Sequence, residues 1–254
     1  MSARVKAYVN LFAAMGVLQK YVELDEEAKK IAKEHNIVVR FKVKGGPDGQ
    51  VIFKDGAVKV IPTDESISSD VVLYCPTADK FNDVVDGKGM PIPVKGLFKT
   101  LAFMGKPESP FNVLTGRMAD IMRGKGTDTP ELQKLSTLLA FYAMSAAIAQ
   151  IGNEDEIGAL AGKRIPDGDI SLEIKDAAYA TITKKDGKLT CRFEKTANPR
   201  AVMAFDSIQT AGDLINGKAD AMSCISMGQL EMKGYIPMLD NLNKVLNLVP
   251  KYLS

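Results

Sequence analysis

The chain has 254 residues, of which 46% are hydrophobic and 25% are charged. This length exceeds a typical domain, and the composition is that of a folded globular protein, which excludes a disordered, collagen-like or multi-span membrane chain. The formal net charge of +2 lacks the basic excess of proteins that bind nucleic acids through phosphate groups, so we expect no nucleic-acid partner.

The first half of the chain is predicted to begin with a helix and to continue as strands. Residues 7–18 form an apolar, helix-like stretch, and no small-residue cleavage pattern follows it, so it is not expected to be a signal peptide. Strand-like segments follow at residues 37–43, 51–53, 58–61 and 71–75. Asp55 and Gly56 have the residue types of a two-residue hairpin turn.

The second half has the same order of elements. Residues 135–151 are apolar but shorter and more polar than a membrane span requires, so we predict a buried or interface helix. Strands are predicted at residues 170–174, 178–183, 189–193 and 202–205, with a turn at Asp186 and Gly187. The last helix carries an apolar stripe that consists of Ile236, Leu239, Leu242, Leu246 and Val249.

Three local matches between the halves indicate an internal repeat. Residues 12–15 match residues 141–144 at an offset of 129, residues 54–56 match residues 185–187 at 131, and residues 83–88 match residues 213–218 at 130. Matches in the same order at nearly constant offset are typical of a duplicated unit. Because residues 124–130 have the chemistry of a linker and a helix start, we predict two units, residues 1–126 and 127–254.

Few side chains are available for catalysis or metal binding. The single histidine, His35, is expected to be exposed at a helix end. The cysteines Cys75, Cys191 and Cys224 are odd in number and widely spaced, which argues against a disulfide framework or a zinc site and suggests a reducing compartment. We therefore expect no catalytic residues, no metal and no cofactor.

The second half resembles the sterol carrier protein type-2 (SCP2) lipid-transfer family. A short helix ends in residues 213–218, and a Gly-x-Leu-x-x-x-Gly segment made of Gly228, Leu230 and Gly234 leads into the last helix. The resemblance covers about residues 132–253. In the first half it is partial: residues 83–88 fit, Lys95-Gly96-Leu97-Phe98 is matched with Met227-Gly228-Gln229-Leu230, and several prolines interrupt the pattern.

The resemblance implies an α+β fold of two tandem SCP2-like units. Each would have a curved, mainly antiparallel sheet with helices packed on one face and an apolar cavity between them. The implied function is non-catalytic binding or transport of a hydrophobic ligand such as a fatty acid, an acyl-CoA or a sterol-like lipid, with transient membrane contact. The last residues, 251–254, are not a peroxisomal signal, so we expect a cytoplasmic location, and a homo-oligomer is compatible with the sequence.

Methionine-rich segments of the second unit are the candidate lining of this cavity. Methionine is unbranched and polarizable and adapts to ligands of different shape, although ordinary core packing gives the same pattern. Strand alternation places Leu230 and Met232 on one face, directed at the helices. The proposed lining consists of Met203, Phe205, Leu214, Met222, Ile225, Leu230, Met232, Ile236 and Leu239.

Two alternatives remain open from the sequence. The chain could be a structural or interaction module with a closed core that dimerises through apolar helices, especially residues 138–148. It could also be an enzyme that acts on an acyl thioester through Cys224 or Asp213, but the sequence places no base beside either group.

Overall fold

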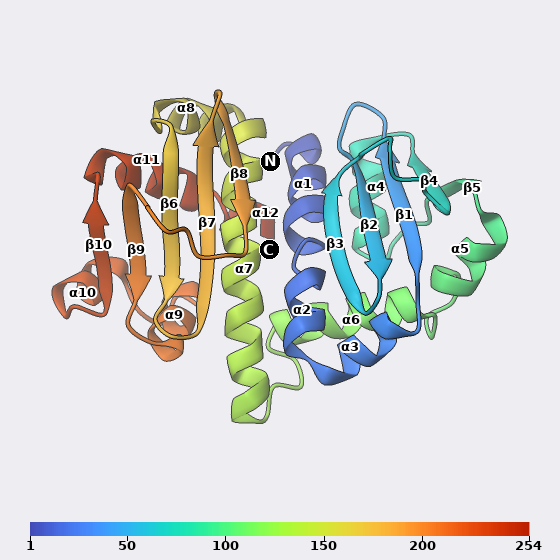
Figure 1. The fold of residues 1–254 in the computed structure, drawn as a ribbon, viewed down its shortest axis with the longest axis horizontal. Helices are drawn as coiled ribbons and strands as arrows, with labels where there is room; N and C mark the ends of the chain where they lie inside the picture. Colours follow the sequence, from blue (N-terminus) through green and yellow to red (C-terminus); the bar gives the residue numbers. More distant parts are fainter. Residues whose placement is uncertain (254) are drawn as a thin grey trace. The chain divides into compact units, whose positions relative to one another are not determined.

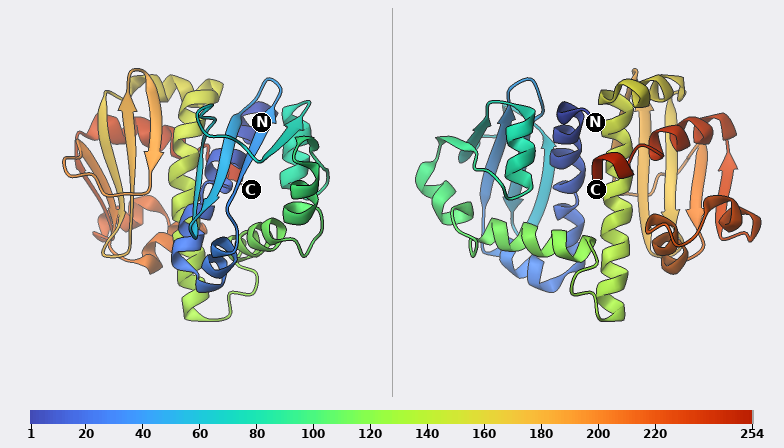
Figure 2. Two further views of the ribbon diagram at one scale, coloured as in Figure 1. Left: turned by 45° about the vertical axis from the view of Figure 1, so that its right-hand side comes forward. Right: turned by 180° about the vertical axis from the view of Figure 1, so that it is seen from behind.

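The computed structural model of the protein describes residues 1–253. The chain divides into two compact units, of which the first spans Met1–Gly126 and the second begins at Thr127. Each unit has one five-stranded sheet with helices on one of its faces (Figures 1 and 2). The α+β fold class with two such units is therefore confirmed.

The first unit contains helices at both ends and a sheet between them. Its elements are α1 (Ala3–Val9), the π-helical turn η1 (Asn10–Ala14), α2 (Leu18–Leu24), α3 (Glu26–Lys33), β1 (Ile37–Val43), β2 (Asp48–Lys54), β3 (Ala57–Pro62), β4 (Val71–Cys75), α4 (Ala78–Val85), β5 (Ile92–Lys95), α5 (Leu97–Met104) and α6 (Pro110–Met122).

The second unit begins with a long helix and has a similar succession of elements. They are α7 (Pro130–Glu154), α8 (Glu156–Arg164), β6 (Gly168–Ile174), β7 (Ala178–Lys185), β8 (Lys188–Arg192), β9 (Ala201–Phe205), α9 (Ile208–Ile215), α10 (Ala221–Ser226), β10 (Leu230–Gly234), α11 (Ile236–Leu246) and α12 (Pro250–Leu253).

The two sheets have the same topology. The strand order in the first sheet is β3-β2-β1-β4-β5. The second sheet, read from the edge formed by β8, has the equivalent order β8-β7-β6-β9-β10. In both, the first strand pairs in parallel with the fourth, and the other pairs are antiparallel. Val39 pairs with Val71 in the first sheet and Ile170 with Ala201 in the second, so equivalent residues lie 130 or 131 positions apart.

The second and third strands of each sheet are joined by the predicted tight turns. Asp55 and Gly56 have φ values of 52° and 79°, and Asp186 and Gly187 have values of 49° and 78°. Positive φ at both central residues is the requirement of a type I′ hairpin, which the Asp-Gly pair meets at little cost. These turns fix the register of both hairpins.

The N-terminal helix differs from the prediction of one helix over residues 7–18. A π-helical turn separates α1 from α2, and within it the amide of Met15 donates to the carbonyl oxygen of Asn10 five residues earlier. The buried Asn10 side chain donates to Asn82 of α4, and Asn82 donates to the carbonyl oxygen of Ala3. These tertiary bonds hold the extra residue of the π-turn in place.

Helix α7 is long and apolar enough, by length and composition, to cross a membrane, but 72% of its most apolar window is buried in the structure. Thr129 caps it through the amide of Leu132, and Pro130 occupies the first turn, where no amide donor is needed. Within its unit it packs against α8, α9, α11, β7 and β8.

Candidate functional site

The predicted lining residues of β9 and β10 lie on one face of the second sheet. Leu230 is paired with Phe205, and Met232 with Met203, in the antiparallel register of the two strands. Met203, Phe205 and Leu230 are buried, and Met232 is half-buried. The alternation that predicted a common face for Leu230 and Met232 is present in the structure.

Helices α9 and α11 pack against this face. Helix α11 contacts both β9 and β10, and Leu239 is fully buried in it. Leu214 on α9, which packs against β9, is half-buried. Six of the candidate residues therefore lie on β9 or on an element that contacts β9, namely β10, α9 or α11: Met203, Phe205, Leu214, Leu230, Met232 and Leu239.

The apolar stripe of the last helix is only partly as predicted. Leu239 and Leu242 are buried, as predicted. Met238 and Val245, which the predicted stripe did not include, are buried as well, whereas Ile236 is 45% exposed. Tyr235 lies between Gly234 and the start of the helix, and Ile236 is exposed as the first residue of the helix. Val249 is buried, but it lies beyond the end of α11.

Helix α10 carries two candidate residues away from the core. Asp220 caps the helix through the amide of Ser223, and Cys224 is its buried residue. Met222 is 73% exposed and Ile225 is also exposed. We name as the β10 edge the exposed apolar side chains on both sides of that strand: Met222, Ile225, Met227, Tyr235 and Ile236.

The structure also contains two pockets that the sequence did not predict, and both lie in the first unit. One, of about 300 Å³, is lined by Glu34, His35, Asn36, Ile37, Lys99, Ala102 and Phe103. The other, of about 460 Å³, shares Asn36 and Ile37 and continues along β2 to Phe53 and along the loop to Ile67 and Asp70. No local pattern could indicate them, because their walls come from the loop after α3, from β1, β2 and α5, and from the loop before β4.

The interior of the first unit is filled by phenylalanine side chains. The ring centroids of Phe53 and Phe103 are 5.2 Å apart, those of Phe103 and Phe111 are 5.8 Å apart, and those of Phe41 and Phe81 are 5.8 Å apart. Such tilted and edge-on ring contacts occupy the space between the sheet and α4, α5 and α6.

The second unit has smaller or polar side chains at three equivalent positions. By the shared register, Phe41 corresponds to Leu172, and Phe53 corresponds to Lys184. The caps of α4 and α9, Thr77 and Ser207, align Phe81 with Ala211. At these three positions the second unit is less aromatic than the first, although Phe205 occupies the position equivalent to Cys75.

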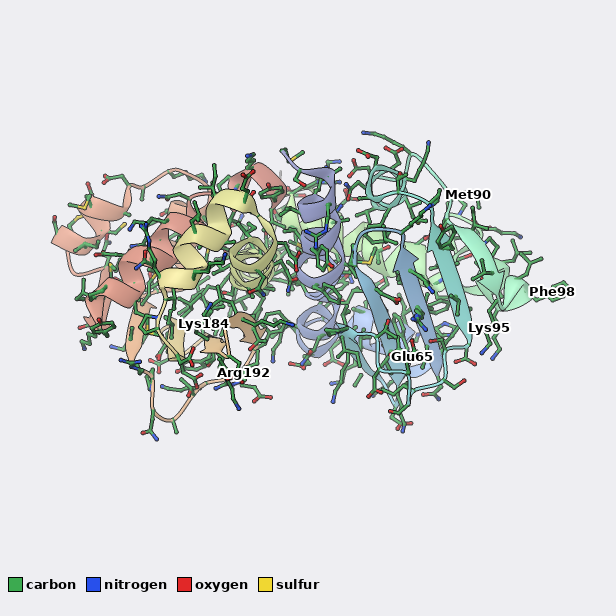
Figure 3. The ribbon with its side chains drawn as sticks, turned by 90° about the horizontal axis from the view of Figure 1, so that it is seen from above. Glu65, Met90, Lys95, Phe98, Lys184 and Arg192 are labelled. Carbon is green, nitrogen blue, oxygen red and sulfur yellow. The ribbon has the colours of Figure 1, made fainter. Side chains whose placement is uncertain are left out.

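Lys184 is a buried cation at the end of β7 (Figure 3). Its Nζ donates to the carbonyl oxygens of Gly162 and Gly187, at 2.9 Å each. Burial lowers the pKa of this lysine, because the charged form loses solvation that the two carbonyl groups replace only in part.

The side chains considered for thioester chemistry lie on two different helices, Cys224 on α10 and Asp213 on α9. Cys224 is buried, and Asp213 accepts a hydrogen bond from Gln209 on the same helix. His35 lies in the other unit, edge-on to Phe103 at 5.2 Å. Among residues 1–253, no three His, Cys, Asp or Glu side chains are grouped as metal ligands.

Comparison with known proteins gives similarity at the level of solved structures. No family model matches the chain, and no curated protein sequence matches it. Three similar solved structures are the UbiJ-SCP2 ubiquinone synthesis protein, the sterol carrier protein domain 2 of Helicoverpa armigera, and the stereoselective inverting sec-alkylsulfatase Pisa1 from Pseudomonas sp..

The two SCP2 structures match less than half of this chain and nearly all of their own. The UbiJ-SCP2 protein is 15% identical to this chain, and the match covers 41% of this chain and 94% of that protein, with a TM-score of 0.32. The Helicoverpa armigera domain is 19% identical, covers 48% and 93%, and has a TM-score of 0.36. The sulfatase is 14% identical to this chain. The match covers 60% of this chain and 29% of the sulfatase, with a TM-score of 0.26.

Proposed function

We propose that the second unit binds a hydrophobic ligand, a fatty acid, acyl-CoA or sterol-like lipid, between β9–β10 and helices α10 and α11, and that the protein carries it without catalysing a reaction. We place this activity in the cytoplasm and regard the two units as a tandem duplication. The observation that carries the proposal is the gradation of apolar side chains on β9 and β10: Met203 and Leu230 are buried, Met232 is half-buried, and the β10 edge on either side of that strand in the sequence is exposed.

Apolar side chains at a solvent-exposed edge are costly unless something covers them. In the second unit these side chains border β10, which has a neighbour on one side only. An acyl chain inserted beside Met232 would extend the core outward, and displacement of the six-residue helix α10 would admit it. The flexible side chains of Met203, Met222 and Met232 can adapt to ligands of different shape.

The difference between the two interiors supports placing the ligand in the second unit. The rings of Phe41, Phe53 and Phe81 fill the first interior, where their equivalents in the second are Leu172, Lys184 and Ala211. Fewer rigid rings leave an interior that can repack at lower cost. The first unit then acts as a scaffold whose interior is occupied by these rings, and its two pockets are not the proposed ligand site.

The proposal is tested by titrating the delipidated full-length protein with a fluorescent fatty acid. Met232→Asp introduces a charge into the proposed lining and is expected to weaken uptake by tenfold or more, because a buried charge without a partner is strongly unfavourable. Leu160→Asp, at an exposed position of α8, is the matched control and is expected to leave uptake unchanged.

Circular dichroism of both variants confirms that they are folded. Native mass spectrometry of the untreated protein is expected to reveal a copurified lipid. Absence of both a lipid and fatty-acid binding would contradict the proposal, and unchanged uptake by folded Met232→Asp would exclude the assigned face.

The packed phenylalanine rings of the first unit favour a second candidate function, an interaction module that dimerises. The helix residues first considered for this, 138–148, include Leu139, Phe141 and Ile148, which are fully buried in the single chain, so a dimer would have to use a different apolar surface. Sedimentation equilibrium tests this alternative: a concentration-dependent dimer without ligand binding would favour it.

A further inference from the structure

We infer that the β5–α5 region of the first unit docks onto membranes that contain anionic lipids. We name as the docking face six exposed apolar side chains that follow one another along this region: Met90, Ile92, Val94, Leu97, Phe98 and Leu101. The inference goes beyond ligand binding in the second unit and does not require it, because the residues of the docking face belong to the first unit.

Helix α5 has its apolar side chains on both faces, although only one face is covered. Thr100 and Phe103 are buried and turn the helix toward the rest of its unit. Leu97, Phe98 and Leu101, at helical spacing on the other side, are exposed, and Phe98 is 85% exposed. Figure 3 shows Met90, Lys95 and Phe98 at the β5 edge of the unit, with Phe98 directed outward.

The turn before α5 fixes this orientation. Gly96 has a φ of 76°, and a Cβ atom there would lie 2.4 Å from the carbonyl oxygen of Asp70. The chain therefore passes from β5 into α5 within one residue, and the first turn of the helix presents Leu97 and Phe98 beside the strand. The docking face is consequently built on a constrained turn.

The charges around the docking face are complementary to an anionic surface. Residues 87–107 include Lys88, Lys95, Lys99 and Lys106 and contain no aspartate or glutamate. Lys95 donates to the carbonyl oxygen of Ser69, so its charge is not neutralised by that partner, whereas Lys99 and Lys88 pair with Asp70 and Asp86. Exposed aromatic and aliphatic side chains among lysines are typical of surfaces that insert into the headgroup region of a bilayer.

The equivalent edge of the second unit has exposed apolar side chains without this charge. The residues equivalent to 87–107 are 217–245, which contain Lys218, Lys233 and Lys244 together with Asp220, Glu231 and Asp240, so the positive and negative charges balance. Both edges have exposed apolar side chains, but only the first carries an excess of lysines. Because an anionic lipid surface attracts lysines, this difference favours a lipid surface as the occupant of the docking face. Pro93 within β5 removes an amide donor from this strand, which disfavours a partner that adds by strand pairing.

The test uses cosedimentation of the full-length, ligand-free protein with vesicles of phosphatidylcholine alone or with 30% phosphatidylserine. We expect binding to the anionic vesicles that weakens as salt is raised. Phe98→Glu is expected to weaken this binding about tenfold or more, because the largest inserted side chain is lost. Lys95→Gln and Lys106→Gln are each expected to weaken it about fivefold.

Leu160→Glu is the matched control, since Leu160 is 60% exposed on α8, outside both the docking face and the β10 edge, and is expected to be neutral for vesicle binding. The proposal is overturned if the wild type does not bind anionic vesicles, or if Phe98→Glu binds them as well as the wild type. It is also overturned, in favour of a second copy of the chain, if Phe98→Glu instead dissociates a dimer in the absence of vesicles. Vesicle binding by a protein that takes up no fatty acid would support docking and contradict only the proposed ligand binding.

Discussion

At the residue scale, two aspartates in equivalent positions join the start of a helix to the end of each unit. Asp25 caps α3, and both carboxylate oxygens accept hydrogen bonds from Arg117 of α6. Asp155 caps α8 through the amides of Ile157 and Gly158 and accepts a hydrogen bond from the hydroxyl of Tyr252 in α12. Burial opposes ionisation of Asp155, but these three donors outweigh it and hold its pKa below the usual value.

Replacing Tyr252 by phenylalanine tests this contact. Because the folded-state pKa of Asp155 is lowered, the contact contributes stability above the unfolded pKa of about 3.9, and this is lost as pH falls through the folded value. We expect Tyr252→Phe to reduce the free energy of unfolding by about 1–2 kcal/mol at pH 7 and by progressively less as the pH falls through the lowered pKa of Asp155. Urea denaturation at pH 7 and pH 2.5 measures this.

Tyr235→Phe is the control, since Tyr235 is exposed and should be neutral at both pH values. An equal loss for Tyr252→Phe at pH 7 and pH 2.5 would mean that the hydroxyl acts independently of the ionised carboxylate.

At the element scale, β5 and β10 each end at a glycine with positive φ, Gly96 directly after β5 and Gly234 as the last residue of β10, and a side chain at either glycine would be strained. Lys95 pairs with Val72 and Lys233 with Val202, so Gly96 corresponds to Gly234. The structure thus corrects the sequence match of Gly96 with Gly228. The offset is 138 at Lys95 and Lys233 but 130 at Lys88 and Lys218, so the second unit has eight more residues here, and they include α10.

Alanine at either glycine should destabilise the unit that contains it. The φ values of Gly96 and Gly234 are 76° and 85°, and an added Cβ would lie 2.4 and 2.3 Å from a backbone carbonyl oxygen. We expect Gly96→Ala and Gly234→Ala each to lower the free energy of unfolding by about 2 kcal/mol or more. Thermal or urea denaturation measures the change.

Gly116 in α6 supplies the contrasting substitution, because nothing lies within 4 Å of its added Cβ. Gly116→Ala is expected to be neutral or to stabilise by up to about 1 kcal/mol, as for a helical glycine. Similar losses at all three positions would contradict the role of the two turns.

At the scale of the whole molecule, two units of one topology carry different chemistry. The first has an aromatic interior and a lysine-rich apolar edge, and the second has a methionine-containing face and an edge of balanced charge. The segment between α6 and α7 includes Gly124 and Gly126, both with positive φ, and its residues are mostly exposed.

Limited trypsin digestion tests the proposed boundary after residue 126. Arg123 and Lys125 are exposed in this segment, and proteases act first on exposed chain between folded units. We expect the first cuts after these residues, giving two fragments of nearly equal mass that intact mass spectrometry identifies. The double variant R123Q/K125Q should slow this step, and first cuts within a sheet would contradict the boundary.

The sequence by itself determined the features that depend on neighbours in the chain. The Asp-Gly turns, the strands of both hairpins and the alternation of Leu230 and Met232 follow from local backbone preferences and period-two patterning, and matches at nearly constant offset predicted two units with the same order of elements. These signals were sufficient for the fold class.

Only the tertiary structure decided which apolar side chains are covered. Met222, Ile225 and Ile236 were predicted to line a cavity with Leu230 and Leu239, yet the first three are exposed and the last two are buried. Exposure of Phe98 likewise could not be predicted, because a helix with apolar residues on both faces gives no periodic signal. Burial depends on which distant elements pack together, and in this protein that packing separates a filled interior from two exposed apolar edges.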